Sequence, residues 1–339
     1  MTPDPRLPHH PGMIRRRFLL TSLAGAMGAS LAAEAQQAGK VYRIGFLGPG
    51  TPIVFAPGIE ALRLGLRDHG YVEGRNITIE YRWAENRYDR LPELAAELVR
   101  LNPDVIITQG TPSTLAAKRA TSAIPIVMSI IGNPVENGVV ASLAQPGGNI
   151  TGSSFFSDEV TAKRLEILKT GYPPLLRVGF LTNPQNTGAG GTRRAMEAMA
   201  QGLNVRVQFL GVRTPDELDV ALTAAKTQID GIVMADEQVV TVGDSPRRIA
   251  DFTLKGRLPS IGPSQYPQVG GLLGYGVAWT DVVRGSMVLV DKILKGTKPA
   301  DLPIQQATRF ELVINLKTAK ALGLTIPPSL LARADQVIE

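Results

Sequence analysis

The sequence predicts an α/β protein with two lobes of one architecture, each a parallel sheet flanked by helices. From residue 41 onward, short apolar strand segments alternate with segments of helical periodicity. Mostly apolar strands in such an alternation are typical of parallel sheets that are covered on both faces. The pentapeptide Arg43-Ile-Gly-Phe-Leu47 also returns as Arg177-Val-Gly-Phe-Leu181, which indicates that the plan is used twice.

The first half is predicted to contain four strands and three helices. A buried strand is expected over 41–47, because a short apolar run ends there in Gly-Pro-Gly. Residues 57–69 carry apolar side chains every three or four positions, and Gly70 ends this helix. The same criteria predict strands over 76–83, 104–108 and 124–129, and helices over 88–101 and 112–121.

The second half repeats this order of elements. Strands are predicted over 177–181, 204–210 and 230–234, and helices over 191–201 and 215–227. Asn76-Ile-Thr-Ile-Glu-Tyr81 aligns with Asn204-Val-Arg-Val-Gln-Phe209, and Asp104-Val-Ile-Ile-Thr-Gln109 aligns with Asp230-Gly-Ile-Val-Met-Ala235. Convergence is the alternative, since buried parallel strands resemble one another. Three matches in the same order favour two related lobes.

The N-terminal residues have the features of an export signal. The basic cluster Arg15–Arg17 precedes an uncharged apolar stretch over 18–33, and Ala33-Glu34-Ala35 supplies small residues for cleavage after Ala35. The sequence thus predicts a signal peptide within 1–35 and a periplasmic mature protein that does not span the membrane, since no later stretch is long and apolar enough.

Two questions about this segment stay open. Arg15-Arg16 followed by Phe18-Leu19 resembles the twin-arginine motif, but a Sec signal that carries three arginines is the alternative. Residues 1–12 are rich in proline and are expected to be unstructured, and either Met1 or Met13 fits as the start.

Composition argues against several function classes. A formal net charge of +6 without a long basic run gives no support for a nucleic-acid partner. The absence of Cys excludes disulfides, thiol nucleophiles and Cys-ligated metals. His69 is interpreted as a solvated residue before a helix stop rather than a general base. No nucleotide-binding or nucleophile motif occurs, so we expect no cofactor, no metal site and no catalytic residue.

The turns after the predicted strands suggest a ligand site. In open α/β sheets, ligands bind beyond the carboxyl ends of strands, and here these turns offer small polar side chains and free helix N–H groups that suit a carboxylate. Ordinary capping is the alternative at each single turn, but several such turns in both halves favour a cleft. The candidate ligand-binding residues are Gly48, Thr51, Gly110, Thr111, Ser113, Asn133, Asn183, Asn186, Asp236 and Tyr266.

Two of these turns give the most specific expectation. Thr111-Pro-Ser113 combines a proline suited to a first helical turn with two hydroxyls that can bind an anion. Asp236 follows a strand of the second half and could pair with an ammonium group across the cleft, with a helix cap as the alternative.

Five longer segments resemble a known family. They are 65–77 (GLRDHGYVEGRNI), 90–99 (RLPELAAELV), 145–152 (QPGGNITG), 163–166 (KRLE) and 310–327 (FELVINLKTAKALGLTIP). Together they resemble ABC transporter substrate-binding proteins of the group that includes TrpX-type aromatic amino acid binders. The resemblance covers nearly the whole mature chain. It implies a type I periplasmic binding fold, in which two Rossmann-like lobes are joined by a three-segment hinge and close on a ligand.

The resemblance also implies a domain division. The three crossings are expected near 151–155, 274–277 and 307–310, which gives lobe one as 41–151 plus 277–307 and lobe two as 152–276 plus 308–339. The predicted hinge residues are Thr151, Gly152, Gly274 and Gly276, because glycine tolerates the backbone changes that closure requires.

The implied function is capture of a small carboxylate-bearing solute, such as an amino acid, and its delivery to the membrane subunits of an ABC permease. Residues 235–245 depart from the loop of most members, so the ligand is left open. Phe155, Phe156, Tyr266 and Tyr275 fall near the cleft or hinge and could stack on a flat ligand, with hinge packing as the alternative for Phe155 and Phe156. A ligand-binding sensor subunit and an exported α/β enzyme are the rival functions.

Overall fold

The structure is a computed structural model that describes residues 40–339, and every contact discussed below lies within Arg43–Glu339. The predicted signal peptide over 1–35, with its cleavage after Ala35, falls outside the described residues. None of the helices in the described part has the length and apolarity that a membrane span requires.

The strands form two sheets, and the first has the order β11-β5-β4-β3-β1-β2. Its strands are β1 (Tyr42–Gly48), β2 (Ile77–Trp83), β3 (Val105–Gln109), β4 (Ile126–Ile131), β5 (Ile150–Ser154) and β11 (Gln305–Gln306). Strand β1 pairs in parallel with β3, β3 with β4, β4 with β5, and β5 with β11.

The second sheet has the order β13-β12-β10-β9-β8-β6-β7. Its strands are β6 (Arg177–Thr182), β7 (Arg206–Gly211), β8 (Gly231–Met234), β9 (Ser260–Gly262), β10 (Leu273–Val277), β12 (Phe310–Asn315) and β13 (Gln336–Ile338). Its pairs are parallel except for β10 with β12, which is antiparallel. The predicted α/β fold class with two parallel sheets is confirmed.

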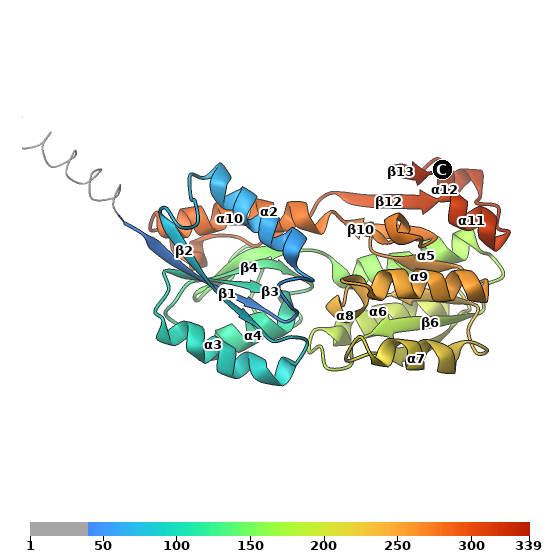
Figure 1. Cartoon of the computed structure of the whole chain (residues 1–339), viewed down its shortest axis with the longest axis horizontal. Helices are drawn as coiled ribbons and strands as arrows, with labels where there is room; N and C mark the ends of the chain where they lie inside the picture. The colour runs from blue at the N-terminus through green and yellow to red at the C-terminus, as the bar shows by residue number, and fades with distance from the viewer. Residues whose placement is uncertain (1–39) are drawn as a thin grey trace, which may run out of the picture. The chain divides into compact units, whose positions relative to one another are not determined.

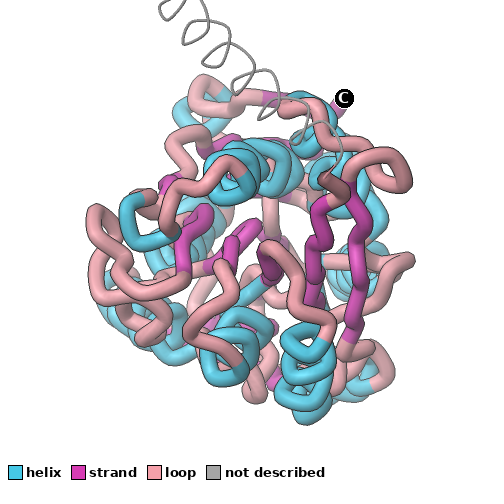
Figure 2. The backbone as a smooth tube through the Cα atoms, turned by 90° about the vertical axis from the view of Figure 1, so that its left-hand side faces the viewer, coloured by secondary structure: helices cyan, strands magenta, loops and turns pink. Residues whose placement is uncertain are grey.

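Helices cover both faces of the first sheet. Figure 1 shows α2 (Ala56–Asp68) beside α10 (Trp279–Leu294) on one side, although they are far apart in the sequence. Helices α3 (Leu91–Arg100) and α4 (Gly110–Ala120) lie on the other side, and the turn η1 (Tyr88–Arg90) leads into α3. The view in Figure 2 shows the same layering along the strands.

The second sheet is covered in the same way. Right-handed crossovers place α6 (Ala189–Gly202) on the face opposite α7 (Glu217–Ala225) and α9 (Ser245–Gly256). Helix α5 (Ser157–Gly171) packs against α6. The shorter elements are α8 (Gln238–Thr241), η2 (Tyr266–Val269), η3 (Pro299–Asp301), α11 (Leu316–Leu322) and α12 (Pro328–Leu331).

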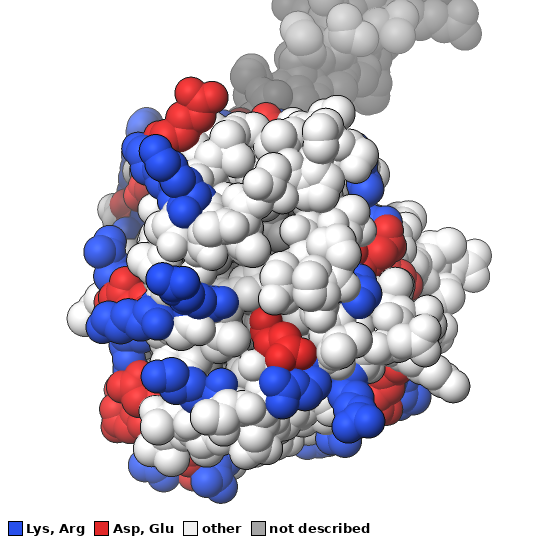
Figure 3. Space-filling model, turned by 90° about the vertical axis from the view of Figure 1, so that its right-hand side faces the viewer, with Lys and Arg blue, Asp and Glu red and all other residues white. Residues whose placement is uncertain are grey.

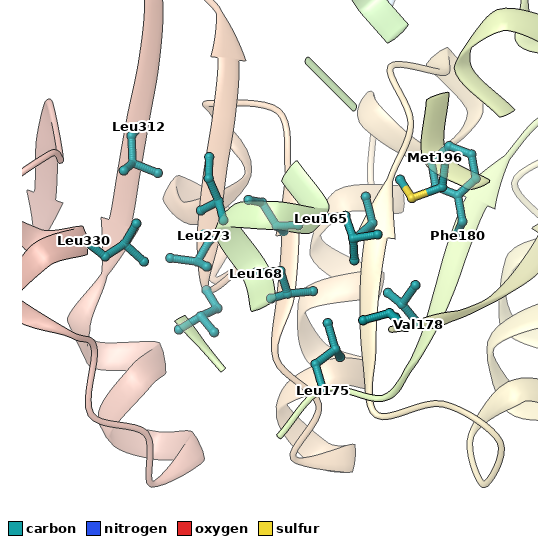
Figure 4. Packing of buried hydrophobic residues seen from close by; sticks show 14 of the residues in the cluster. Leu165, Leu168, Leu175, Val178, Phe180, Met196, Leu273, Leu312 and Leu330 are labelled. Carbon is teal, nitrogen blue, oxygen red and sulfur yellow. The ribbon is translucent and has the colours of Figure 1, made fainter. Parts of the chain in front are cut away.

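A buried apolar cluster anchors α5 on the second sheet. Figure 4 shows Leu165 and Leu168 of α5 among side chains of the strands, including Val178 and Leu273. All four are fully buried, and burial of one such side chain contributes about 1.5–3 kcal/mol. Helix α5 is therefore held firmly where the chain enters the second lobe, by which we mean the second sheet and its helices.

Three segments connect the two lobes. Strand β5 ends at Ser154 in the first sheet and α5 begins at Ser157; β10 ends at Val277 and α10 begins at Trp279; β11 ends at Gln306 and β12 begins at Phe310. The first connection is thus later than the predicted boundary at 151/152, because β5 stays paired with β4 and β11 through Ser154.

The four predicted hinge residues lie inside strands rather than in these connections. Thr151 and Gly152 belong to β5, and Thr151 Oγ1 donates to the carbonyl of Leu302. A side chain at Gly152 would strike the Met128 carbonyl of β4, so close strand packing accounts for this glycine. Gly274 and Gly276 belong to β10, which is paired with β12. A hinge role for the four stays a prediction.

Aromatic rings pack where the chain crosses between the lobes. Phe310 packs against Phe156 and Tyr275, with ring centroids 6.3 Å apart in each pair. Two of the aromatic residues predicted to stack on a ligand therefore pack at this crossing.

Figure 3 shows basic and acidic side chains interspersed on the face in view, without a broad field of one sign.

Candidate ligand-binding site

A cavity of about 150 Å³ lies between the two sheets. From the first lobe and the adjoining connections it is lined by Phe55, Gln109, Gly110, Thr111, Ile130, Ile131, Gly132, Asn137, Phe155, Val277 and Trp279. From the second lobe it is lined by Ser157, Thr161, Asn186, Gly188, Ala189, Thr192, Ala235, Asp236, Glu237, Gln238, Thr241, Val242, Pro263 and Gln265. An engineered cavity of about this volume is known to hold a benzene ring, so the space suits a small ligand.

Helix N-termini from both lobes reach this cavity. Strand β3 passes directly into α4 at Gly110, whose φ of +75° is accessible to glycine at little cost. Gly110 and Thr111 then border the cavity, and Gly188 and Ala189 at the start of α6 border it from the opposite lobe. Because the first N–H groups of a helix lack intrahelical partners, both ends favour a negatively charged group.

The cavity also contains two acidic side chains, Asp236 and Glu237, which follow β8. Asp236 Oδ1 accepts a hydrogen bond of 2.8 Å from Arg164 Nη2, while Asp236 Oδ2 is buried and has no hydrogen-bond partner among the described residues. These two acids are the only charged side chains in the described lining. An unpaired carboxylate oxygen is a suitable acceptor for an ammonium group.

Glu237 is held in a buried network. The pKa of Glu237 is raised to about 7, mainly by burial; the hydrogen bond from Asn186 opposes this rise and the nearby Asp236 adds to it. Asn186 Nδ2 donates to both carboxylate oxygens at 2.9–3.0 Å. Burial also raises the pKa of Tyr88 well above its ordinary value, and Glu237 contributes. The first-lobe turn η1 therefore meets this network.

Aromatic rings form another part of the wall. Phe55 and Trp279 lie 5.5 Å apart between ring centroids and are tilted by 36°. Phe155, in the first connection between the lobes, also lines the cavity. Flat apolar rings of this kind bind apolar or aromatic groups well.

Two side-chain pairs join the lobes across the cleft. Gln238 of α8 donates a hydrogen bond to Oε1 of Gln109, at the end of β3. Arg194 of α6 forms an ion pair with Glu136, which follows β4. These contacts describe a closed arrangement of the two lobes.

Four of the ten predicted binding residues line the cavity: Gly110, Thr111, Asn186 and Asp236. Two others serve turns next to it. Thr51 Oγ1 accepts from the Val54 N–H, and Asn133 Oδ1 accepts from the Glu136 N–H. Local capping has taken these polar groups, which is the alternative that the sequence left open.

The remaining four predicted residues face the protein interior. A side chain at Gly48 would collide with Trp83, so this glycine serves packing. Ser113 and Asn183 are fully buried outside the lining. Tyr266 is 2% exposed, and its hydroxyl lies 3.0 Å from Ser260 Oγ in the second core. None of the four lines the cavity in this structure, and a binding role for them stays a prediction.

The sequence analysis missed several residues of the lining. Gln109 ends β3, and Gln238 begins α8 shortly after β8 ends, so their positions alone could have suggested them. Phe55 and Trp279 could not be found in this way, because α10 brings Trp279 back from a distant part of the chain. Within residues 40–339, no group of three or more His, Asp or Glu side chains is placed to hold a metal ion.

Two α/β lobes around a small polar and aromatic cavity define a bilobal binding protein of the type I fold. The family model of ABC transporter substrate-binding proteins matches residues 57–338. The chain belongs to this family, as the sequence resemblance indicated.

Individual relatives agree with this assignment. A tyrosine-binding protein of Clostridioides difficile (strain R20291) is 27% identical over 279 residues, which cover 81% of this chain and 80% of that protein. The crystal structure of a conserved domain protein from Vibrio cholerae matches with a TM-score of 0.81 at 26% identity, covering 88% of this chain and all of that one. An ABC domain from Streptococcus pneumonia, solved with L-Trp, matches with a TM-score of 0.80 at 24% identity over 88% of this chain and 100% of that chain.

Proposed function

We propose that this protein is the extracytoplasmic solute receptor of an ABC importer and that it binds a free amino acid with an aromatic side chain. The observation that carries the proposal is the arrangement of the cavity: helix N-termini, the acidic side chains Asp236 and Glu237 and aromatic rings surround one small space. An α-amino acid presents a carboxylate, an ammonium group and a side chain to these three features.

The carboxylate of the ligand would bind at the N-termini of α4 and α6. Thr111 contributes a hydroxyl at the first of these and is 5% exposed. Ser113, the other hydroxyl expected there, is not part of the lining, so backbone N–H groups and Thr111 are the donors in this proposal. Desolvated donors of this kind bind a carboxylate more strongly than they would in water.

The ammonium group would bind the Asp236 carboxylate, and the side chain would pack against Phe55, Phe155 and Trp279. A relative that is 27% identical is a tyrosine-binding protein, which supports an aromatic side chain. Residues 236–238 of the segment that the sequence resemblance singled out as atypical line the cavity, so we propose that the ligand preference can differ from that of other members.

Binding would stabilise the closed arrangement, because only there do both lobes contact the ligand at once. The three connections would act as the hinge, and the closed form would dock on the permease. Export through the predicted N-terminal signal, by a twin-arginine or Sec route, would place the protein outside the cytoplasm. No step alters the ligand.

Ligand identification by native mass spectrometry of the purified protein tests this function, followed by a thermal-shift screen of amino acids. A ligand that binds the folded state raises the melting temperature, and recovery of the ligand unaltered is expected. Recovery of a converted product would contradict the proposal and favour the exported enzyme.

The site assignment has its own test. The double variant Thr111→Ala/Asp236→Ala removes one hydroxyl donor and one charged acceptor, so affinity for the identified amino acid is expected to fall at least about tenfold. Thr223→Ala/Asp251→Ala makes the same changes at exposed positions of the second lobe and should bind normally. Unchanged affinity in the first pair would refute the assignment.

A further inference from the structure

Arg164 is a buried cation next to the cavity, and its side chain is only 1% exposed. It lies on α5, about two turns after the first connection between the lobes. A buried guanidinium is costly unless its N–H groups are paired. The three hydrogen-bond partners of Arg164 therefore indicate the role of this buried charge.

These partners come from two parts of the second lobe, β10 and the end of β8. Arg164 Nε donates to the Tyr275 carbonyl of β10 at 2.7 Å, Nη1 donates to the Met234 carbonyl at the end of β8 at 2.9 Å, and Nη2 donates to Asp236 Oδ1 at 2.8 Å. The planar guanidinium can donate hydrogen bonds in several fixed directions at once, whereas the ammonium group of a lysine is a compact point charge.

The surrounding residues leave room for this group. A Cβ atom added at Gly276 would lie 2.9 Å from Arg164 Nη2, so the glycine that was expected to act as a hinge also makes space for the guanidinium. Directly after Arg164, α5 is anchored by the buried core residues Leu165 and Leu168. The arginine therefore has a fixed support.

We infer that Arg164 is the specificity-determining positioning residue of the cavity: it holds the Asp236 carboxylate in the cavity wall, and its charge balances that carboxylate so that the site favours a zwitterion over a simple cation. This inference rests on the proposed function, whose ligand class it sharpens. Arg164 itself does not line the cavity and acts through Asp236.

The charge argument follows from the residues in the lining. Asp236 and Glu237 are the only charged side chains there among the described residues. With Arg164 in place the Asp236 charge is balanced. Glu237, whose pKa is raised to about 7 by burial, carries only part of a charge near neutral pH, so a ligand needs to bring little net charge. Without Arg164 the cavity wall carries an unbalanced carboxylate in a desolvated space, where Coulomb interactions are strong. The affinity for a cationic ligand should then rise relative to the affinity for a zwitterion.

The test compares L-tyrosine with tyramine, which keeps the ring and ammonium group but lacks the carboxylate and is a cation at neutral pH. The measured quantity is the ratio of their affinities by isothermal titration calorimetry. Wild type should prefer L-tyrosine, and Arg164→Met should lower this ratio at least about tenfold. A role confined to folding would weaken both ligands equally and leave the ratio unchanged, which would overturn the inference.

Arg177→Met is the matched control. Arg177 pairs with Asp230 at 2.6 Å in the same lobe but does not line the cavity, so this variant should keep the wild-type affinity ratio.

A second variant separates the loss of charge balance from misfolding of Arg164→Met. Arg164→Met/Asp236→Asn removes both charges of the pair, so it should fold and should not show the lowered ratio of the single variant; a ratio as low as in Arg164→Met would contradict the charge-balance argument.

A ligand-free measurement separates this inference from the proposed function. Urea unfolding of Arg164→Met, Asp236→Asn and the double variant forms a cycle in which direct pairing predicts non-additive losses of stability. If wild type binds neither probe, the proposed aromatic amino acid class fails while the cycle still decides the pairing. Additive losses in that cycle would overturn the role of Arg164.

Discussion

Gln109 and Gln238 hydrogen-bond to each other across the cleft, from the end of β3 in one lobe to α8 in the other. Both side chains are buried, and both line the cavity. The pair links closure directly to the walls of the candidate site. Gln238 Oε1 has no hydrogen-bond partner among the described residues and lies against Gly50, where an added Cβ atom would be 2.6 Å from it.

Removal of this bridge should favour the open arrangement. Gln238→Ala deletes a neutral hydrogen bond, whose net contribution is about 0.5–1.5 kcal/mol, and it leaves Gln109 without its partner. Because the chain contains no Cys, cysteines introduced at exposed Arg119 and Lys226 allow labelling for energy transfer between the lobes. We expect a larger separation for Gln238→Ala without ligand.

Gln228→Ala is the control for this measurement. Gln228 is exposed and donates only to the Ala224 carbonyl at the end of α7, so the separation between labels should match wild type. An identical distribution of distances in Gln238→Ala and wild type would show that the amide bridge does not influence closure.

Glu237 should make stability depend on pH. Its pKa is about 7 in the folded protein, against 4.5 as the ordinary value, because of burial. Between these values the folded state holds a proton that the unfolded state has lost, so the stabilising effect is complete below pH 4.5 and is lost as pH rises through 7. This difference in pKa corresponds to about 3 kcal/mol in the free energy of unfolding.

Urea unfolding of wild type and Glu237→Gln as a function of pH checks this sign. The variant cannot titrate, so its stability relative to wild type should increase as pH rises from about 5 to about 8. The paired carboxyls of Asp68, Asp230 and Glu217 have lowered pKa values and affect stability only at more acidic pH. A constant difference between the two proteins would contradict a raised pKa.

The strands that could be predicted are those that their own local sequence identifies, without knowledge of their pairing partners. Strands β1, β3 and β8 are short apolar runs, and their predicted bounds differ from the observed ones by at most one residue at each end. Strands β9, β12 and β13 were not assigned individually. They are short or depend on partners brought together by the crossings, such as the antiparallel pairing of β12 with β10.

The site was predictable to the level of its turns but not of its side chains. Thr111 and Ser113 stand two residues apart at the start of α4, and residues at that spacing point to different sides of a helix. Thr111 borders the cavity, while Ser113 is buried outside the lining. Strand ends therefore identify the region, whereas the rotation of each helix decides which hydroxyl faces a ligand.

The two tryptophans offer a direct report of binding. Trp279 lines the cavity, whereas Trp83 packs against Phe46 with ring centroids 5.0 Å apart and is not part of the lining. Binding of an aromatic amino acid should change the intrinsic fluorescence through Trp279. The change should vanish in Trp279→Phe and persist in Trp83→Phe, and the opposite result would place the ligand elsewhere.

Gly188 and Thr111 provide a steric test of closure. They face each other from the two lobes, and a Cβ atom added at Gly188 would lie 2.7 Å from Thr111 Oγ1 and 3.0 Å from Thr111 Cβ. Gly188 has φ −85°, which alanine adopts without strain. Gly188→Ala should thus fold normally but resist closure, and ligand affinity should fall at least about threefold, since forced overlap in a packed contact costs about 1–3 kcal/mol.

Gly190→Ala is the matched control, because a Cβ atom there would meet only Arg194 Nη1 at 3.6 Å, an ordinary contact within α6. Its affinity should equal that of wild type, and its stability should rise slightly because alanine favours the helix. In the double variant Gly188→Ala/Thr111→Gly the opposing side chain is gone, so energy transfer between the lobes should return to the wild-type closed value even if the loss of Thr111 weakens binding. Normal closure of Gly188→Ala alone would mean that the lobes meet differently in solution.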